Sequence, residues 1–334
     1  MVSWTPMNSD QPEIPPLKDP APEEMTRTGR LWLTAGIAGL AGLVATFVLW
    51  LVTMASKSGV PAVAGVFIVP YFIGFCAAIP WRSQPATERP VLGFSFLLTL
   101  GCCLGAAIVL REGSVCLAMA FPILWLGVAL GVMTSFTLGQ KGGRLQFSVI
   151  PALMVAMVVD ARTPGENTDV VVDEIVIRAP AANVFPYVVQ FPEITAPPSH
   201  WLNRIGLPAA KQTTSEGPFV GAQRACIFSN GLVFPEQITE LEPGKRLTFI
   251  VTEQPNDPEL FGHFDLHKGQ FDLRDNGDGT TTLVGTSWYT LRVRPIWYFN
   301  LWSKDIIRDV HLRVMNHIKT LAEADVAREA RSMR

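Results

Sequence analysis

Charged side chains are spread very unevenly along this chain, and this division limits its fold more than any other feature. Residues 31–159 contain only eight Asp, Glu, Lys or Arg side chains, whereas residues 160–334 contain 18 basic and 22 acidic ones. Four uncharged apolar runs lie in the first part, each near the ~20 residues that cross a hydrocarbon core about 30 Å thick; they are 31–54, 61–80, 91–110 and 114–136. The sequence therefore predicts a membrane α-helical bundle at 31–159, followed by a separate polar domain.

The regions beside these four runs leave the number of spans open. Residues 1–30 are rich in proline and poor in large apolar residues, which predicts a disordered tail. A fifth apolar run at 145–159 has only 15 residues and contains Pro151. It is compatible with a short span, a re-entrant piece or an interfacial segment. We therefore expect four to five spans.

The basic residues predict the orientation of this bundle. The tail and alternate loops place seven Lys or Arg residues on one side of the membrane and two, Lys57 and Arg111, on the other. This bias puts the N-terminus in the cytoplasm of an integral membrane protein, in a bacterial inner membrane. The C-terminal domain is then extracytoplasmic if 145–159 spans, which we favour, and cytoplasmic if it does not.

The bundle itself shows no sign of a transport route, because its spans contain no Asp, Glu, Lys, Arg or His. We interpret it as an anchor. Glycines at 36, 39, 42, 101 and 105 would allow close helix contact, so a homodimer stays open, as does a membrane-protein partner. With a net charge of −2 and no Lys/Arg run, nucleic-acid binding has no electrostatic support.

After a linker at 160–168, residues 169–323 show the alternation of short strands, and 324–334 are expected to be a tail. A strand at 169–179 precedes a short helix at 180–191 and a proline-rich stretch. Further strands are expected at 222–229, 232–241, 245–253, 268–275 and 280–293, with glycine-containing turns between several of them. The apolar positions of 297–321 form one helical stripe. A long amphipathic helix thus covers an antiparallel sheet, which makes an α+β domain.

The domain resembles the START, plant allergen and polyketide cyclase/dehydrase superfamily, also called SRPBCC or helix-grip proteins. The resemblance lies in IVIRAPAANVFPYVVQFPEI, in GTTTLVGTSWYTL before the last helix, and in the order of the elements. It implies a curved antiparallel sheet wrapped around the C-terminal helix, with a deep apolar pocket for lipids, polyketides, hormones or other hydrophobic molecules. It implies no particular reaction and no shared catalytic set.

Polar residues on the apolar stripe of the last helix are the main candidates for ligand binding. Asn300, Ser303 and His311 lie within or beside the stripe, and His317 lies at its edge. A buried polar group needs a partner, which is either protein or ligand. His311 is the candidate acid or base, since imidazole titrates near neutral pH.

The sequence gives weaker support for a functional role at three other places. Arg224 on a strand would bind an anionic head group if it faced inward, but an unpaired buried charge is so unfavourable that we expect it to face outward. Cys226 on the same strand is expected to be a small buried thiol. His263 and His267 are too constrained by neighbouring Gly and Pro to share a metal, so we expect no metal and no cofactor.

The leading functional hypothesis is a membrane-anchored protein that binds, senses or transfers a hydrophobic ligand, a lipid or an isoprenoid- or polyketide-like molecule. Two alternatives stay open. One is a cyclase- or dehydratase-like enzyme with His311 as acid or base, and the other is a non-catalytic subunit of a membrane protein assembly.

Overall fold

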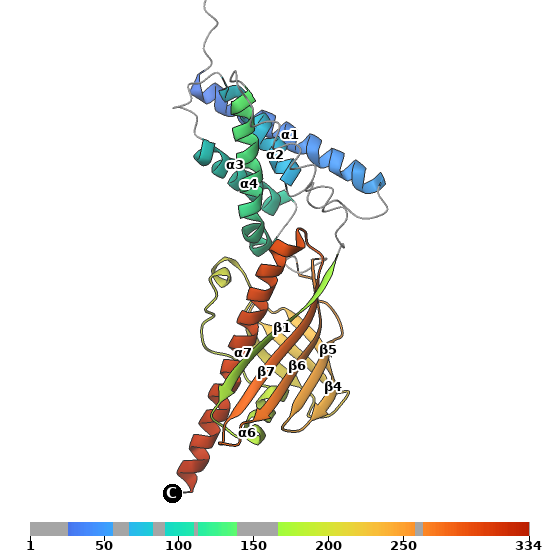
Figure 1. The fold of residues 1–334 in the computed structure, drawn as a ribbon, viewed down its shortest axis with the longest axis vertical. Coiled ribbons are helices and arrows are strands. Elements are labelled where there is room, and N and C mark those ends of the chain that lie inside the picture. Colours follow the sequence, from blue (N-terminus) through green and yellow to red (C-terminus); the bar gives the residue numbers. More distant parts are fainter. Residues whose placement is uncertain are drawn as a thin grey trace, which may run out of the picture.

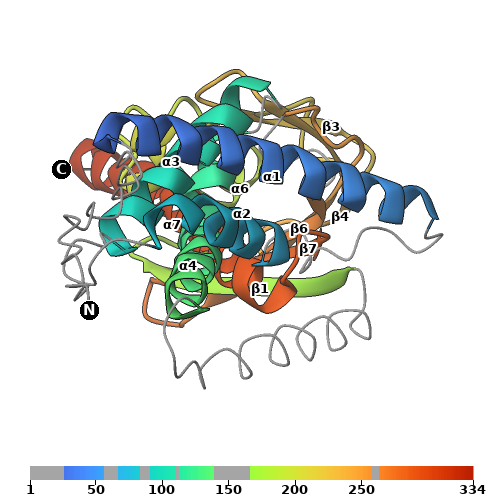
Figure 2. The ribbon, with the colours of Figure 1, turned by 90° about the horizontal axis from the view of Figure 1, so that it is seen from above.

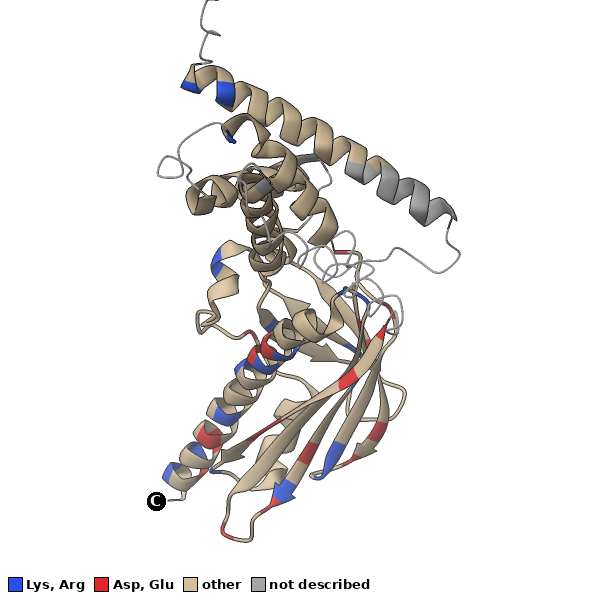
Figure 3. Cartoon of the chain, turned by 45° about the horizontal axis from the view of Figure 1, so that its top comes forward, with Lys and Arg blue, Asp and Glu red and all other residues tan. Residues whose placement is uncertain are grey.

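The computed structural model describes residues 26–55, 67–82, 91–109, 113–138, 166–257 and 263–333. They form a helical part and a sheet-containing domain, with one long helix running down the domain (Figure 1). Charged side chains are concentrated in the domain. Among the described residues of the helical part, only Arg27, Arg30 and Arg82 are charged (Figure 3). The predicted division of the chain into an apolar and a polar part is therefore visible in the fold.

The helical part consists of α1 (Arg27–Ala55), α2 (Val69–Ala77) with the short 3-10 helix Ile79–Trp81, α3 (Val91–Val109) and α4 (Ser114–Leu138). By length and composition, two stretches of the described residues could cross a membrane, Val91–Ile108 and Ser114–Thr137. The predicted span at 61–80 instead gives a nine-residue helix, with Pro70 in its first turn and Pro80 in the 3-10 helix. The run at 145–159 lies outside the described residues. Among the described residues, two helices are long and apolar enough to span a membrane, whereas four to five spans were predicted.

Close packing in the helical part uses different glycines from the expected ones. A side-chain carbon at Gly74 or Gly131 would collide with the backbone of the facing helix, so α2 and α4 approach closely at these positions. Gly36, Gly39, Gly101 and Gly105 face open space among the described residues. Seen from above, α1 and α2 lie across the rest of the molecule (Figure 2).

The domain contains one seven-stranded antiparallel sheet in the order β1-β7-β6-β5-β4-β3-β2. Its strands are β1 (Asn167–Ile177), β2 (Ala210–Ser215), β3 (Gln223–Phe228), β4 (Val233–Glu242), β5 (Arg246–Val251), β6 (Phe264–Asp275) and β7 (Thr281–Leu291). Glycines with positive φ, Gly231, Gly244 and Gly277, form three of the predicted turns. β2 was not predicted, and β6 begins at Phe264 rather than at 268.

Three helical segments complete the domain: α6 (Ala181–Val189), a 3-10 helix at Trp201–Ile205, and α7 (Ile296–Ser332). The 37-residue α7 lies along the sheet and continues nine residues beyond 323, through much of the expected tail. This arrangement, a curved antiparallel sheet with a long C-terminal helix, is the helix-grip architecture that the resemblance implies.

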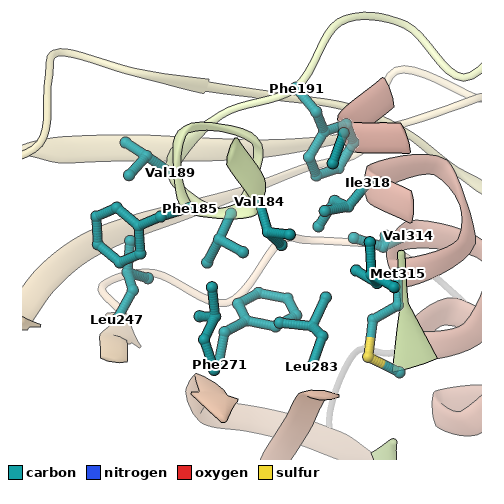
Figure 4. Close-up of a cluster of buried hydrophobic side chains, with 14 of the residues drawn as sticks. Val184, Phe185, Val189, Phe191, Leu247, Phe271, Leu283, Val314, Met315 and Ile318 are labelled. Atoms are coloured by element: carbon teal, nitrogen blue, oxygen red, sulfur yellow. The ribbon is translucent and has the colours of Figure 1, made fainter. Parts of the chain in front are cut away.

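The packed core fills one end of the space between the sheet and α7. Val184 and Phe185 of α6, Leu283 of β7, and Met315 and Ile318 of α7 belong to one buried cluster (Figure 4). These α7 residues come from its second half. The other end, beside the first half of α7, is organised differently and contains the candidate site.

The N-terminal half of α4 packs on the domain. Ser114 Oγ donates a hydrogen bond to the Ile205 carbonyl, and Tyr298 Oη donates to the Met119 carbonyl at 2.6 Å. Ile123 joins a second buried cluster with Tyr289 and Phe299. The C-terminal end of α4 points away from the domain (Figure 1). The domain is therefore attached at the α4 end that follows residue 113.

Candidate functional site

A cavity of about 670 Å³ lies between the sheet, the first half of α7 and the start of α4. Its walls are mostly apolar. Side chains of α7 contribute one wall (Phe299, Ser303, Ile306, Ile307, Val310, His311 and Val314), and β3 to β7 contribute the opposite wall, including Phe228, Phe234, Phe249, Leu266 and Phe271. The volume is within the ~300–1,000 Å³ typical of small-molecule pockets. The pocket that the resemblance implies is thus present.

The apolar helix α4 supplies part of the cavity wall. Val115, Cys116, Met119, Ala120 and Leu124 line the cavity together with domain residues. The helix-grip domain therefore does not enclose this space by itself. Part of its wall belongs to α4, one of two helices among the described residues that are long and apolar enough to cross a membrane.

Arg224 faces into the cavity, so the expectation that it faces outward is wrong. Its side chain is 3% exposed and lies 3.3 Å, Nη1 to Oε2, from Glu236, which is 4% exposed. The two residues are directly opposite each other on β3 and β4. The guanidinium also lies over the Phe249 ring, 4.5 Å from its centroid. The carboxylate and the ring explain how a buried arginine is tolerated here.

This buried pair is not fully satisfied. Nε and Nη1 of Arg224 and Oε2 of Glu236 make no hydrogen bond among the described residues, although Nη1 and Oε2 are within ion-pair distance. Burial raises the pKa of Glu236 to about 7, against the opposing effect of the Arg224 charge. Buried polar groups without partners are rare and unfavourable. The pair thus presents unused donors and acceptors to a mostly apolar cavity.

Cys226 also lines the cavity, two residues from Arg224. Burial, followed by the Glu236 charge, raises the pKa of its thiol to about 12. The thiol is therefore protonated at neutral pH. The side chain is only partly buried, so the expected small buried thiol is confirmed in part.

His311 is held between two side chains of the sheet. Its Nδ1 lies 3.0 Å from Asp173 Oδ2 on β1, and its Nε2 lies 2.8 Å from Ser287 Oγ on β7. His311 and Asp173 are buried, and His311 and Ser287 line the cavity. Burial lowers the pKa of His311, although the hydrogen bond and charge of Asp173 oppose this effect. The lowered pKa favours the neutral imidazole at pH 7.

The other candidates on α7 divide into two groups. Ser303 lines the cavity. Asn300 does not line the cavity. Its side-chain amide accepts a hydrogen bond from Tyr289 Oη at 2.6 Å and donates one to Asp169 at 2.7 Å. His317 bonds the Pro192 carbonyl at 3.1 Å. Of the five predicted ligand-binding residues, the structure brings His311, Ser303 and Arg224 to the cavity and gives Asn300 and His317 protein partners.

The two remaining histidines are not placed together for a metal. His263 lines the cavity, whereas His267 lies 2.7 Å from Thr290 Oγ1. Within the described ranges, no group of three or more His, Cys, Asp or Glu side chains is arranged to hold a metal ion.

Sequence reasoning missed Asp173, Ser287 and Glu236. Each has a signal in the strand alternation: Asp173 lies between the inward Val171 and Ile175, and Glu236 between Phe234 and Ile238. A polar residue on the inward face of a strand needs a hydrogen-bond partner, just as a polar residue on the apolar stripe of a helix does, so these three residues could have been identified as candidates.

Comparisons with known proteins concern the domain. No family profile matches the chain, and no curated protein sequence does. Among solved structures, it is similar to the Zhui aromatase/cyclase from Streptomyces sp. R1128 (15% identity, 48% of this chain and 96% of that chain, TM-score 0.34). It is also similar to truncated norcoclaurine synthase from Thalictrum flavum (12%, 48% and 96%, 0.34). A third is a protein from Nitrosospira multiformis (18%, 46% and 94%, 0.32).

Proposed function

We propose that this chain is a membrane-anchored protein whose helix-grip domain binds a hydrophobic ligand, and that it senses or transfers this ligand at the membrane surface. The observation that carries the proposal is the cavity of about 670 Å³ with an apolar wall shared between the domain and α4. An apolar cavity of this size favours a ligand that is poorly soluble in water.

The polar groups of the cavity wall indicate the chemistry of one end of this ligand. At one place in the wall, Arg224 has two N–H-bearing nitrogens and Glu236 has one oxygen that make no hydrogen bond among the described residues. Ser303 and His311 lie on the α7 side. A ligand oxygen, from a carboxylate, carbonyl or hydroxyl, would meet the donors of Arg224 and remove their desolvation penalty. We therefore propose an amphipathic ligand with a long apolar body and an oxygen-bearing end.

The helical part supports membrane attachment. Leu92, Leu97, Leu104 and Ile108 on α3 are each more than half exposed, which would be unfavourable in water and is normal against lipid. We propose four crossings in 31–136, of which the second is short because its helical segment is only Val69–Trp81, and a fifth crossing at 145–159. The bundle then anchors the domain and keeps its cavity close to the bilayer, which is the source of the ligand.

The docking of the domain on α4 supports an extracytoplasmic domain. Lys141 and Arg144 follow the C-terminal end of α4, which favours a cytoplasmic position for that end. The domain contacts the opposite end, at Ser114 and Met119. At 25 residues, α4 is about 37 Å long, little more than a hydrocarbon core of about 30 Å. The domain would therefore lie on the extracytoplasmic side of the membrane, in contact with about the first ten residues of α4.

Cysteine accessibility tests this orientation. In spheroplasts, with native cysteines replaced, we expect an impermeant maleimide to label Glu242→Cys on the exposed part of β4. Arg27→Cys should react only after permeabilisation. The opposite pattern would place the domain in the cytoplasm.

Native mass spectrometry of the detergent-purified protein, with organic extraction and identification of retained molecules, tests the binding function. Ser303→Trp fills the cavity from α7, and Thr320→Trp places the same residue on an exposed part of that helix as the matched control. We expect one defined class of apolar molecule on the wild type and the control, and its loss from Ser303→Trp. Equal retention by all three would remove the cavity as the binding site.

A second function is favoured by one observation, the contact of His311 with Asp173 and Ser287 at the cavity wall. A neutral imidazole beside a ligand is placed for general acid–base chemistry, including the cyclase- or dehydratase-like reactions considered above. The third hypothesis, an assembly subunit without a ligand, would be favoured by a cavity filled with large side chains. The open volume gives it no such support.

A further inference from the structure

Two side chains of the cavity wall, Ser287 and His311, and the buried Asp173 behind them are hydrogen-bonded in the order that serine nucleophiles require. We propose that Ser287, His311 and Asp173 form an acyl-transfer site that hydrolyses an ester of a hydrophobic acid bound in the cavity. The inference rests on the proposed ligand binding and adds the substrate class and the reaction. It assigns the roles of nucleophile to Ser287, base to His311, and positioning residue to Asp173.

The donor and acceptor in each hydrogen bond of Asp173, His311 and Ser287 follow from the chemistry of the three groups. A carboxylate only accepts hydrogen bonds, so the proton between His311 Nδ1 and Asp173 belongs to the imidazole. Nε2 then carries the lone pair and accepts the hydroxyl proton of Ser287, at an Oγ–Nε2 distance of 2.8 Å. This is the arrangement in which a histidine removes the proton of an attacking serine.

The second carboxylate oxygen is also positioned. Arg308 Nε lies 3.5 Å from Asp173 Oδ1, while Oδ2 faces His311. The carboxylate is therefore held from the outer side of α7 by a cation and from the inner side by the imidazole. The lowered pKa of His311 favours its neutral form at pH 7, in which Nε2 is available as a base without prior loss of a proton.

Arg224 is the group that would stabilise the oxyanion. Phe249, whose ring supports the Arg224 guanidinium, packs on Gly269 so closely that a side-chain carbon there would collide with the ring. Gly269 is the register partner of Ser287 on the neighbouring strand. The guanidinium thus lies over a ring that packs on the β6 neighbour of the nucleophile, and its Nε and Nη1 make no hydrogen bond among the described residues. Preorganised cationic donors in a water-poor site stabilise developing negative charge strongly.

The reaction balances with water as the only co-reactant. Ser287 Oγ forms a bond to the acyl carbon and its proton passes to His311 Nε2. The ester C–O bond breaks, and the leaving alcohol takes that proton. Water then attacks the acyl-serine with His311 as base, which releases the carboxylic acid and restores the Ser287 hydroxyl. No oxidant, reductant or metal is required by any of these steps.

The test is covalent labelling of the full-length protein in detergent with an alkyl fluorophosphonate, mapped by peptide mass spectrometry. Hydrolysis of the p-nitrophenyl ester of a medium-chain fatty acid is measured in parallel. We expect the probe on Ser287 of the wild type. Ser287→Ala and His311→Gln should lower ester hydrolysis about 100-fold or more. Ser332→Ala, at the exposed end of α7, is the matched serine control and should leave both readouts unchanged.

Retention of an extracted apolar ligand separates the two proposals. A wild type that retains ligand but is not labelled at Ser287 overturns the acyl-transfer site and leaves ligand binding intact. Labelling that persists in His311→Gln also overturns it, because the serine would then react without His311 as its base. A protein that neither retains ligand nor reacts would remove both proposals. Since the wild type alone gives the labelling result, a variant that misfolds does not decide the outcome.

Discussion

The buried carboxyl of Glu236 should make the free energy of unfolding depend on pH. Burial raises its pKa from 4.5 to about 7 in the folded protein. At ~1.4 kcal/mol per pKa unit, this shift corresponds to about 3 kcal/mol. Below pH 4.5 the carboxyl is protonated in both states. Between pH 4.5 and 7 the unfolded chain loses its proton first, so folding becomes less favourable as pH rises, and the full penalty is present above pH 7.

Glu236→Gln removes this ionisation while preserving the shape of the side chain. We expect the variant and the wild type to have similar stability near pH 4. The variant should gain about 3 kcal/mol relative to the wild type by pH 8. The assay is urea unfolding of delipidated protein, followed by pulsed hydrogen exchange on the β3–β4 peptide. This readout reports the domain rather than the helical part.

Glu242→Gln on the exposed end of β4 is the matched control, since it removes a carboxylate from the same strand without a buried charge. Its difference from the wild type should stay within about 0.5 kcal/mol at all pH values. A Glu236→Gln difference that does not change between pH 4 and 8 would refute the reasoning. Such a result would mean that Arg224 keeps Glu236 ionised throughout.

Two further changes test the packing around the cavity. Met315→Ala removes a fully buried side chain that lies against Gly285 and should lower the free energy of unfolding by roughly 2–5 kcal/mol in the same urea assay; a loss below 1 kcal/mol would contradict the core as described. Tyr289→Phe leaves the Asn300 oxygen without its donor and should destabilise by roughly 1–3 kcal/mol, with faster hydrogen exchange at the start of α7. Unchanged exchange there would show that this contact does not hold the helix.

The element order of the domain could be predicted because its signals are local. Alternation identifies strands, and the turns at Gly231, Gly244 and Gly277 use a backbone conformation that glycine favours. β2 was missed because its register shifts between Ala210 and Gln212, which interrupts the alternation. The helical part was harder, since hydropathy alone does not show that prolines limit α2 to nine residues.

Partners far apart in the sequence explain the incomplete prediction of the site. Helical periodicity placed His311 on the inner face, but Asp173 is 138 residues away and reaches it only through the β1–β7 pairing. Arg224 was expected to face outward because an unpaired buried charge is unfavourable. Counting outward from the Asn230–Gly231 turn brings it opposite or next to Glu236, so the strand pairing supplies the missing partner.

Photocrosslinking with a diazirine-bearing fatty acid in lipid vesicles tests the central claim most directly. The labelled peptides, mapped by mass spectrometry, show where an apolar chain resides. We expect labels at cavity residues of the domain, such as Phe228, Phe249 and Val310, and on the α4 wall near Ala120. Ser303→Trp should remove the domain labels. Labels confined to lipid-facing positions such as Leu97 and Leu104 of α3 would contradict a ligand cavity shared between the domain and the membrane helices.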